Sequence, residues 1–168
     1  MYFNFLKDHI IDWLLEEEDH INWHNDSTQF IRSTIPSISE IDKQEERLKA
    51  LGYHFPLELK AFWNEIGCGY LCPNDTVDNG LEEPNTILDI YFQEGEWAKV
   101  KFTCDILDQN ELPFFRVSDL RYLTIGIEEG MNLGRIYYLG EEIAPNLVDF
   151  VERIMGNPIY YHSLELTV

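Results

Sequence analysis

Basic residues are scarce in this chain, which has 12 Lys and Arg against 31 Asp and Glu and a net charge of -19. Proteins that bind a phosphate backbone rely on Lys and Arg to displace counterions, and anionic membrane surfaces repel acidic proteins. The composition therefore argues against nucleic acid and membrane as partners. It favours a cationic partner, which long-range attraction would bring in faster, or it serves solubility alone.

Cysteine and long apolar runs are scarce as well. Cys68, Cys72 and Cys104 are an odd set without the spacing of a disulfide framework or a zinc ribbon, so we expect free thiols. No apolar run approaches the roughly 20 residues of a membrane helix. The amino terminus has no basic start and turns acidic at Glu16–Asp19, unlike a signal peptide. We therefore expect a cytoplasmic protein.

Motifs of catalysis and cofactor binding are also missing. The chain has no Gly-rich loop ending in Gly-Lys-Ser/Thr and no Gly-x-Ser-x-Gly elbow. Gly67-x-Gly69 is too short for a dinucleotide fingerprint and follows a helical pattern. His20 and His24 have the i, i+4 spacing of a metal pair but no visible third ligand, which favours two surface histidines. The sequence predicts no enzyme, no metal and no cofactor.

What the chain does have is apolar content, with 45% hydrophobic and 14% aromatic residues, which is typical of a globular protein. Its length suits one domain with its own core, and no repeat or low-complexity linker divides it. We therefore expect a single domain over residues 1–168.

The densest local pattern lies between Ile38 and Leu71. Ser39 is predicted to cap a first helix, which Gly52 ends. A second helix is predicted from apolar residues at i, i+3, i+4 and i+7, namely Leu59, Phe62, Trp63 and Ile66. Gly67 is expected to hold a positive φ after that helix, before a strand begins.

Apolar spacing predicts the remaining elements. A helical period predicts amphipathic helices near both ends, with stripes Phe3, Leu6, Ile10, Trp13 and Leu14, and Leu147, Phe150, Val151 and Ile154. Alternating or β-rich composition predicts strands at Thr86–Phe92 and Trp97–Cys104, and strands are also expected at Tyr122–Ile127 and Arg135–Leu139. Polar and turn residues predict connections at Asn22–Pro36, Asp75–Pro84 and Glu128–Gly134. Pro113–Ser118 fits no pattern well.

The central segment resembles the signature of the SUKH superfamily, through Ile41–Leu51, Gly52, Phe55-Pro56, the Leu59/Phe62/Trp63 stripe and Gly67-Cys68-Gly69. The later strand, turn, strand and helix follow in the order of that superfamily, so the resemblance covers about Ser39–Met155. One departure is the exit from the second helix, where the family usually has Asn-Gly or Gly-Asn-Gly. Members include bacterial immunity proteins against polymorphic toxins and the fungal Smi/Knr cell-wall-assembly regulators.

The expected fold is α+β, with a twisted, mainly antiparallel sheet flanked by N-terminal, central and C-terminal helices. The resemblance implies a bacterial immunity protein, or antitoxin, that neutralises a cognate toxin domain. A nuclease fits the charge, because the cationic surface that binds phosphates can be occupied by an anionic protein. The alternative is a Smi/Knr-type regulatory interaction module with no toxin partner.

Partner-binding residues are expected in acidic loops, since loops on a rigid scaffold carry recognition. The candidates are Asp75, Asp78, Glu82 and Glu83 in one loop, and Glu128 and Glu129 in another. Trp97 is either an exposed interface anchor or a core residue. The acidic run Glu16–Asp19 is either a solvated end or a functional patch.

Overall fold

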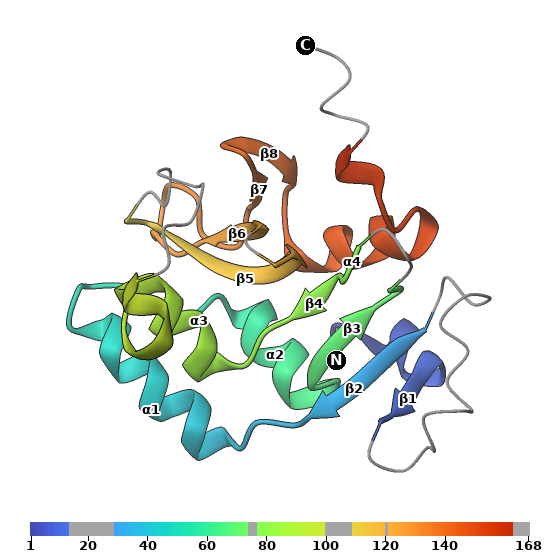
Figure 1. Ribbon diagram of the computed structural model, residues 1–168, viewed down its shortest axis with the longest axis horizontal. Helices are drawn as coiled ribbons and strands as arrows, with labels where there is room; N and C mark the ends of the chain where they lie inside the picture. The colour runs from blue at the N-terminus through green and yellow to red at the C-terminus, as the bar shows by residue number, and fades with distance from the viewer. Residues whose placement is uncertain (14–28, 74–76, 100–108, 120, 163–168) are drawn as a thin grey trace.

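One continuous sheet organises the molecule. The computed structural model describes residues 1–13, 29–73, 77–99, 109–119 and 121–162. The described strands are β1 (Ile10–Asp12), β2 (Phe30–Thr34), β3 (Cys68–Leu71), β4 (Gly80–Leu81), β5 (Glu111–Ser118), β6 (Arg121–Gly126), β7 (Ile136–Tyr138) and β8 (Glu141–Ala144). They form one sheet in chain order, in which β1 pairs with β2 in parallel and the other pairs are antiparallel. The α+β prediction is confirmed, and Figure 1 shows how strongly the sheet twists.

The helices lie between and beside these strands. They are the 3-10 helices η1 (Asn4–His9) and η3 (Gly95–Lys99) and the α-helices α1 (Ile38–Lys49), α2 (Leu57–Glu65), α3 (Pro84–Phe92) and α4 (Leu147–Gly156). Among the described residues, no helix combines the length and apolarity needed to span a membrane.

The N-cap of α1 lies two residues earlier than the sequence predicted. Ser37, and not Ser39, is the N-cap, and its Oγ accepts a hydrogen bond from the Glu40 N–H at 3.1 Å. Ser37 has the extended backbone that an N-cap needs, with φ -70° and ψ 155°, whereas Ser39 already lies inside the first helical turn. Gly52 has φ +82° after the helix, as its predicted role requires.

The exit from α2 confirms the prediction for Gly67, which has φ +108° directly after the C-cap residue Ile66. A Cβ on Gly67 would lie 2.5 Å from the Thr34 carbonyl oxygen, and a Cβ on Gly69 would overlap the Ile31 carbonyl. Both glycines therefore allow β3 to lie close against β2.

One predicted strand is wrong, and a second is contradicted at its start. Thr86–Phe92 belongs to helix α3, which begins at Pro84 and buries Ile87, Leu88 and Ile90. A proline suits the first helical turn, and helical packing outweighed the β-rich composition. Trp97 lies in η3 and not in a strand, while residues 100–104 fall outside the described residues. The segment that fitted no pattern forms most of β5, which is buried along nearly its whole length and so shows no alternation.

The N-terminal prediction is only partly correct. Helix η1 ends at His9, and the chain continues as β1 instead of a long amphipathic helix. Phe3 and Leu6 are buried as the stripe predicted, whereas Leu14 and Glu16–Asp19 lie outside the described residues. The predicted connector and the first predicted loop contain the short strands β2 and β4. Such strands depend on their neighbours in the sheet more than on their own pattern.

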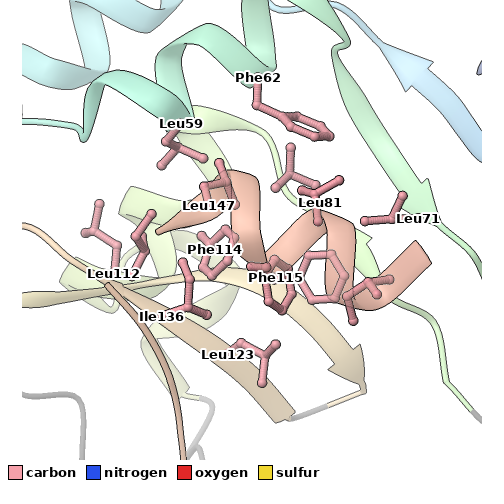
Figure 2. Close-up of a cluster of buried hydrophobic side chains, with 14 of the residues drawn as sticks. Leu59, Phe62, Leu71, Leu81, Leu112, Phe114, Phe115, Leu123, Ile136 and Leu147 are labelled. Atoms are coloured by element: carbon pink, nitrogen blue, oxygen red, sulfur yellow. The ribbon is translucent and has the colours of Figure 1, made fainter. Parts of the chain in front are cut away.

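Helices α2 and α4 cover one face of the sheet and form the core with it (Figure 2). The predicted stripes of both helices are buried. Phe150 of α4 meets Phe115 of β5 edge-on, with ring centroids 5.0 Å apart. Glu58 of α2 also accepts the N–H of Leu147 at 2.9 Å, which fixes α4 against α2.

Candidate functional site

A row of polar side chains crosses the sheet on the face away from this core. Tyr70 of β3 pairs with Gly80 of β4, Gly80 pairs with Arg116 of β5, and Arg116 pairs with Tyr122 of β6. The next row contains Leu81, Phe115 and Leu123, which are buried in the core. Because successive strand residues point to opposite faces, Tyr70, Arg116 and Tyr122 share the other face, which we call the polar face.

Arg116 is the centre of the polar face. Its guanidinium carbon lies 6.0 Å from the centre of the Tyr70 ring, and its Nη2 donates to the Tyr70 hydroxyl at 3.2 Å. Gly80, between them in the row, has no side chain to separate the two groups. The Arg116 Nε lies 3.7 Å from carboxylate oxygens of both Asp78 and Glu82. It is buried and has no hydrogen-bond partner among the described residues.

Glu82 and Glu83 follow β4 and border this arginine. The side chain of Glu82 is only 18% exposed, and its Oε1 accepts the Tyr122 hydroxyl at 3.2 Å. Burial raises the pKa of Glu82, although Arg116 and the Tyr122 hydrogen bond oppose this shift. Glu83 is the N-cap residue of α3, and its Oε1 accepts the Thr34 hydroxyl at 2.6 Å.

A cavity of about 170 Å³ opens between these groups, which we call the first cavity. Tyr70 and Arg116 line it from the strands, and Glu82 and Glu83 line it from the link between β4 and α3. Cys68 also lines it, but burial and then the nearby Glu83 raise the pKa of its thiol. A protonated, buried thiol is a poor nucleophile, so the first cavity is suited to binding by charge and hydrogen bonds.

Trp97 lies at the border of the polar face. It is partly buried and packs against a small cluster of Ile90 and Tyr122. Tyr122 in turn donates to Glu82, so Trp97 is connected to the acidic residues through one side chain. Trp97 is therefore neither a fully exposed anchor nor a fully buried core residue, the two interpretations that the sequence allowed.

The structure brings Asp78, Glu82 and Glu83 together around Arg116, and Trp97 is linked to Glu82 through Tyr122, but Glu128 and Glu129 have different surroundings. Glu128 accepts the Asn110 side chain at 2.9 Å, and Glu129 is exposed in the turn after β6. The remaining candidate, Asp75, lies outside the described residues.

Sequence reasoning did not find Arg116, Tyr70 or Tyr122 as members of the site. Their association depends on cross-strand register, which is a long-range property. The one local signal was Arg116 itself, a lone charge within the apolar run Leu112–Val117.

Metal and cysteine sites give no further candidate in the described ranges. Within them, no group of three or more His, Cys, Asp or Glu side chains is placed to hold a metal ion. Cys68 and Cys72 are both buried, and His20, His24 and Cys104 lie outside the described residues.

Comparison with known proteins identifies the family. The chain is 28% identical over 131 residues to the Immunity protein YxxD of Bacillus subtilis (strain 168), covering 75% of this chain and 84% of that protein. No solved structure matches the chain. Residues 38–151 match the model of the SUKH_6 family, described as SMI1-KNR4 cell-wall. Because this match spans well over half of the sequence, the chain belongs to the SUKH_6 family of the SUKH superfamily.

Proposed function

We propose that this protein is a bacterial immunity protein that binds and neutralises a cognate toxin domain. The observation that carries the proposal is the similarity to an immunity protein over 84% of that relative's length. Membership of the SUKH_6 family supports the same role. The proposed action is binding and not catalysis, since it needs only that the toxin surface be covered.

The charge of the molecule favours a cationic toxin surface. The chain has a net charge of -19, and Asp78, Glu82 and Glu83 gather with Arg116 around the first cavity on the polar face. We propose a nuclease as the toxin, because an enzyme that binds a phosphate backbone presents Lys and Arg to it. An anionic protein can occupy that surface and exclude the substrate.

The proposed contact residues are Asp78, Glu83 and Trp97 on or beside the polar face, Glu128 and Glu129 in the later turn, and Asp75. Glu82 belongs with them, but its role differs from that of a freely exposed loop charge. It is mostly buried and hydrogen-bonded to Tyr122. A Lys at position 82 would face Arg116 and disturb the fold, because burying an unpaired charge is costly.

The second candidate function is a regulatory protein-interaction module without a toxin partner. The description of the matching family as SMI1-KNR4 cell-wall favours it. Such a module would use the same acidic surface toward a different partner.

Co-expression separates the two functions. The toxin domain encoded beside this protein's gene is expressed in a sensitive host, with and without this protein, and purified complexes are sought by size-exclusion chromatography. We expect restored growth and a stable complex. A catalytically inactive toxin is the control, since it should form the complex without affecting growth. If the neighbouring toxin domain neither binds the wild-type protein nor is neutralised by it, the immunity function is rejected in favour of the regulatory module.

A further inference from the structure

Two cavities lie on either side of Glu83. The first cavity lies between Arg116 and the two glutamates. The second cavity, of about 220 Å³, is lined by residues from the β2–α1 connection and the start of α3, with Glu83 again among them. Both are far larger than the roughly 10–15 Å³ that one water requires, so each has room for part of a side chain.

The first cavity is anionic. Glu82 and Glu83 line it, Asp78 lies beside it, and Arg116 is the one cation among its lining residues. The Oε1 atoms of Glu82 and Glu83 accept hydrogen bonds from Tyr122 and Thr34. Each Oε2 atom remains as an acceptor without a donor in the part of the chain that the structure describes. A cation with several N–H donors therefore complements this cavity in charge and in hydrogen bonding.

The second cavity has both polar and apolar walls, with Thr34, Glu40, Glu83 and Asn85 on the polar side. Ile35, Pro36 and Pro84 contribute to its walls. Ile35 is 56% exposed, and Ile38 at the start of α1 is 69% exposed. Large exposed apolar side chains beside a charged pocket are the composition expected of a protein interface, where apolar anchors adjoin polar groups.

We propose that the two cavities together form the docking surface for the toxin domain. A lysine or arginine side chain of the partner enters the first cavity and donates to Glu82 and Glu83. A neighbouring apolar side chain of the partner packs against Ile35 in the second cavity. This inference rests on the proposed immunity function and identifies where on the molecule it is carried out.

Docking in a cavity differs from general charge attraction in its kinetics. Rim charges mainly change the association rate, whereas a desolvated charge pair mainly changes the dissociation rate. Removing one negative charge from a molecule of net charge -19 alters long-range attraction only slightly. An effect confined to dissociation would therefore locate the contact at the cavities.

The first experiment measures association and dissociation rates of the co-encoded toxin domain by surface plasmon resonance. Glu83→Gln keeps an acceptor for Thr34 and removes the charge, and Ile35→Ser removes the apolar contact without changing charge. We expect each to raise the dissociation rate at least about tenfold, as for a buried interface contact. Glu152→Gln, at an exposed position of α4, is the matched control and should change neither rate. Wild-type dissociation rates for both cavity variants, with intact melting curves, would overturn the proposal.

The second experiment uses no toxin. Amide resonances of the isotope-labelled protein are followed during titration with N-acetyl-arginine amide, and separately with the neutral N-acetyl-citrulline amide. We expect the arginine probe alone to shift the resonances of Glu82, Glu83 and Arg116. Equal shifts with both probes, or no shift with either, would show that the first cavity does not select a cationic side chain. If the toxin fails to bind wild-type protein, the immunity function falls while this titration still decides what the first cavity binds.

Discussion

At the scale of single residues, the polar face contains a carboxylate that the fold has largely removed from water. Glu82 is mostly buried beside Arg116 and Tyr122, and burial raises its pKa above the ordinary value of 4.5. Between that value and the raised one, the folded state binds more protons than the unfolded state. The free energy of unfolding contributed by Glu82 therefore falls as the pH rises through this window. The ionised form of Glu82 is therefore less favourable in the fold than the protonated form.

The substitution Glu82→Gln tests this sign. Glutamine can still accept the Tyr122 hydroxyl but cannot ionise, so we expect the variant to be more stable than the wild type at neutral pH. The advantage should diminish as the pH is lowered, because protonation of the wild-type side chain removes the difference in charge. Urea unfolding at a series of pH values measures the difference in stability between the two proteins and how that difference changes with pH. A difference that stays constant with pH, or grows toward acid, would contradict the direction of the shift.

At the scale of elements, the turn from α2 into β3 depends on two properties of Gly67. Its φ of +108° is unfavourable for any residue with a Cβ, and its hydrogen atoms face the Thr34 carbonyl of β2. Gly52, after α1, has φ +82° but no atom within 4 Å of an added Cβ. Both glycines therefore have a positive φ, but only Gly67 lacks room for a Cβ atom.

Alanine at each position separates the two effects. Gly52→Ala should lower the free energy of unfolding by about 1 kcal/mol, because only the left-handed backbone conformation is unfavourable there. Gly67→Ala should cost more, about 1–3 kcal/mol, since β2 must also move away from the new methyl group. Chemical denaturation of both variants gives the comparison. Equal losses would show that the close approach of β2 and β3 at Gly67 contributes nothing.

The elements that the sequence predicted are those whose pattern is local. Helix α2 and helix α4 show their buried stripes directly in the spacing of apolar residues. Helix α3 does not, because its mostly apolar residues Ile87, Leu88 and Ile90 also suit a strand. Strand β5 is buried on both faces and has no alternation to read. For the site, turn chemistry located the acidic loops, but the pairing of Arg116 with Tyr70 and Tyr122 depends on register and could not be read from the chain.

At the scale of the whole molecule, the net charge of -19 governs the approach of a partner. For a cationic toxin domain, the association rate should fall as ionic strength rises. The Debye length shortens from about 30 Å at 0.01 M to about 8 Å at 0.15 M, which screens long-range attraction. Exposed acidic loops near the contact should contribute most to this dependence.

Reversing Glu128 and Glu129 to Lys tests that contribution. We expect slower association with the toxin domain and a weaker dependence of the rate on salt. The exposed charge of Glu129 contributes only about 0–1 kcal/mol to stability, whereas Glu128→Lys also loses the hydrogen bond from Asn110. Stopped-flow kinetics at several salt concentrations measure how steeply the association rate falls with salt. The control reverses Asp8 and Glu152, two exposed residues on η1 and α4, which gives the same change in net charge. Identical slopes for the two double variants would exclude the turn after β6 as a steering surface.

The order of the strands also has a consequence for how the protein is made. Because the sheet runs from β1 to β8 in chain order, each strand from β3 onward joins the edge left by the strand translated just before it. No late segment has to insert between earlier ones, and the ribosome delivers about 5–20 residues per second. The residues that line both cavities lie before residue 117, whereas Phe150 of α4 emerges later and covers the opposite face. The residues of both cavities are therefore translated before α4, whose packing closes the core on the other face.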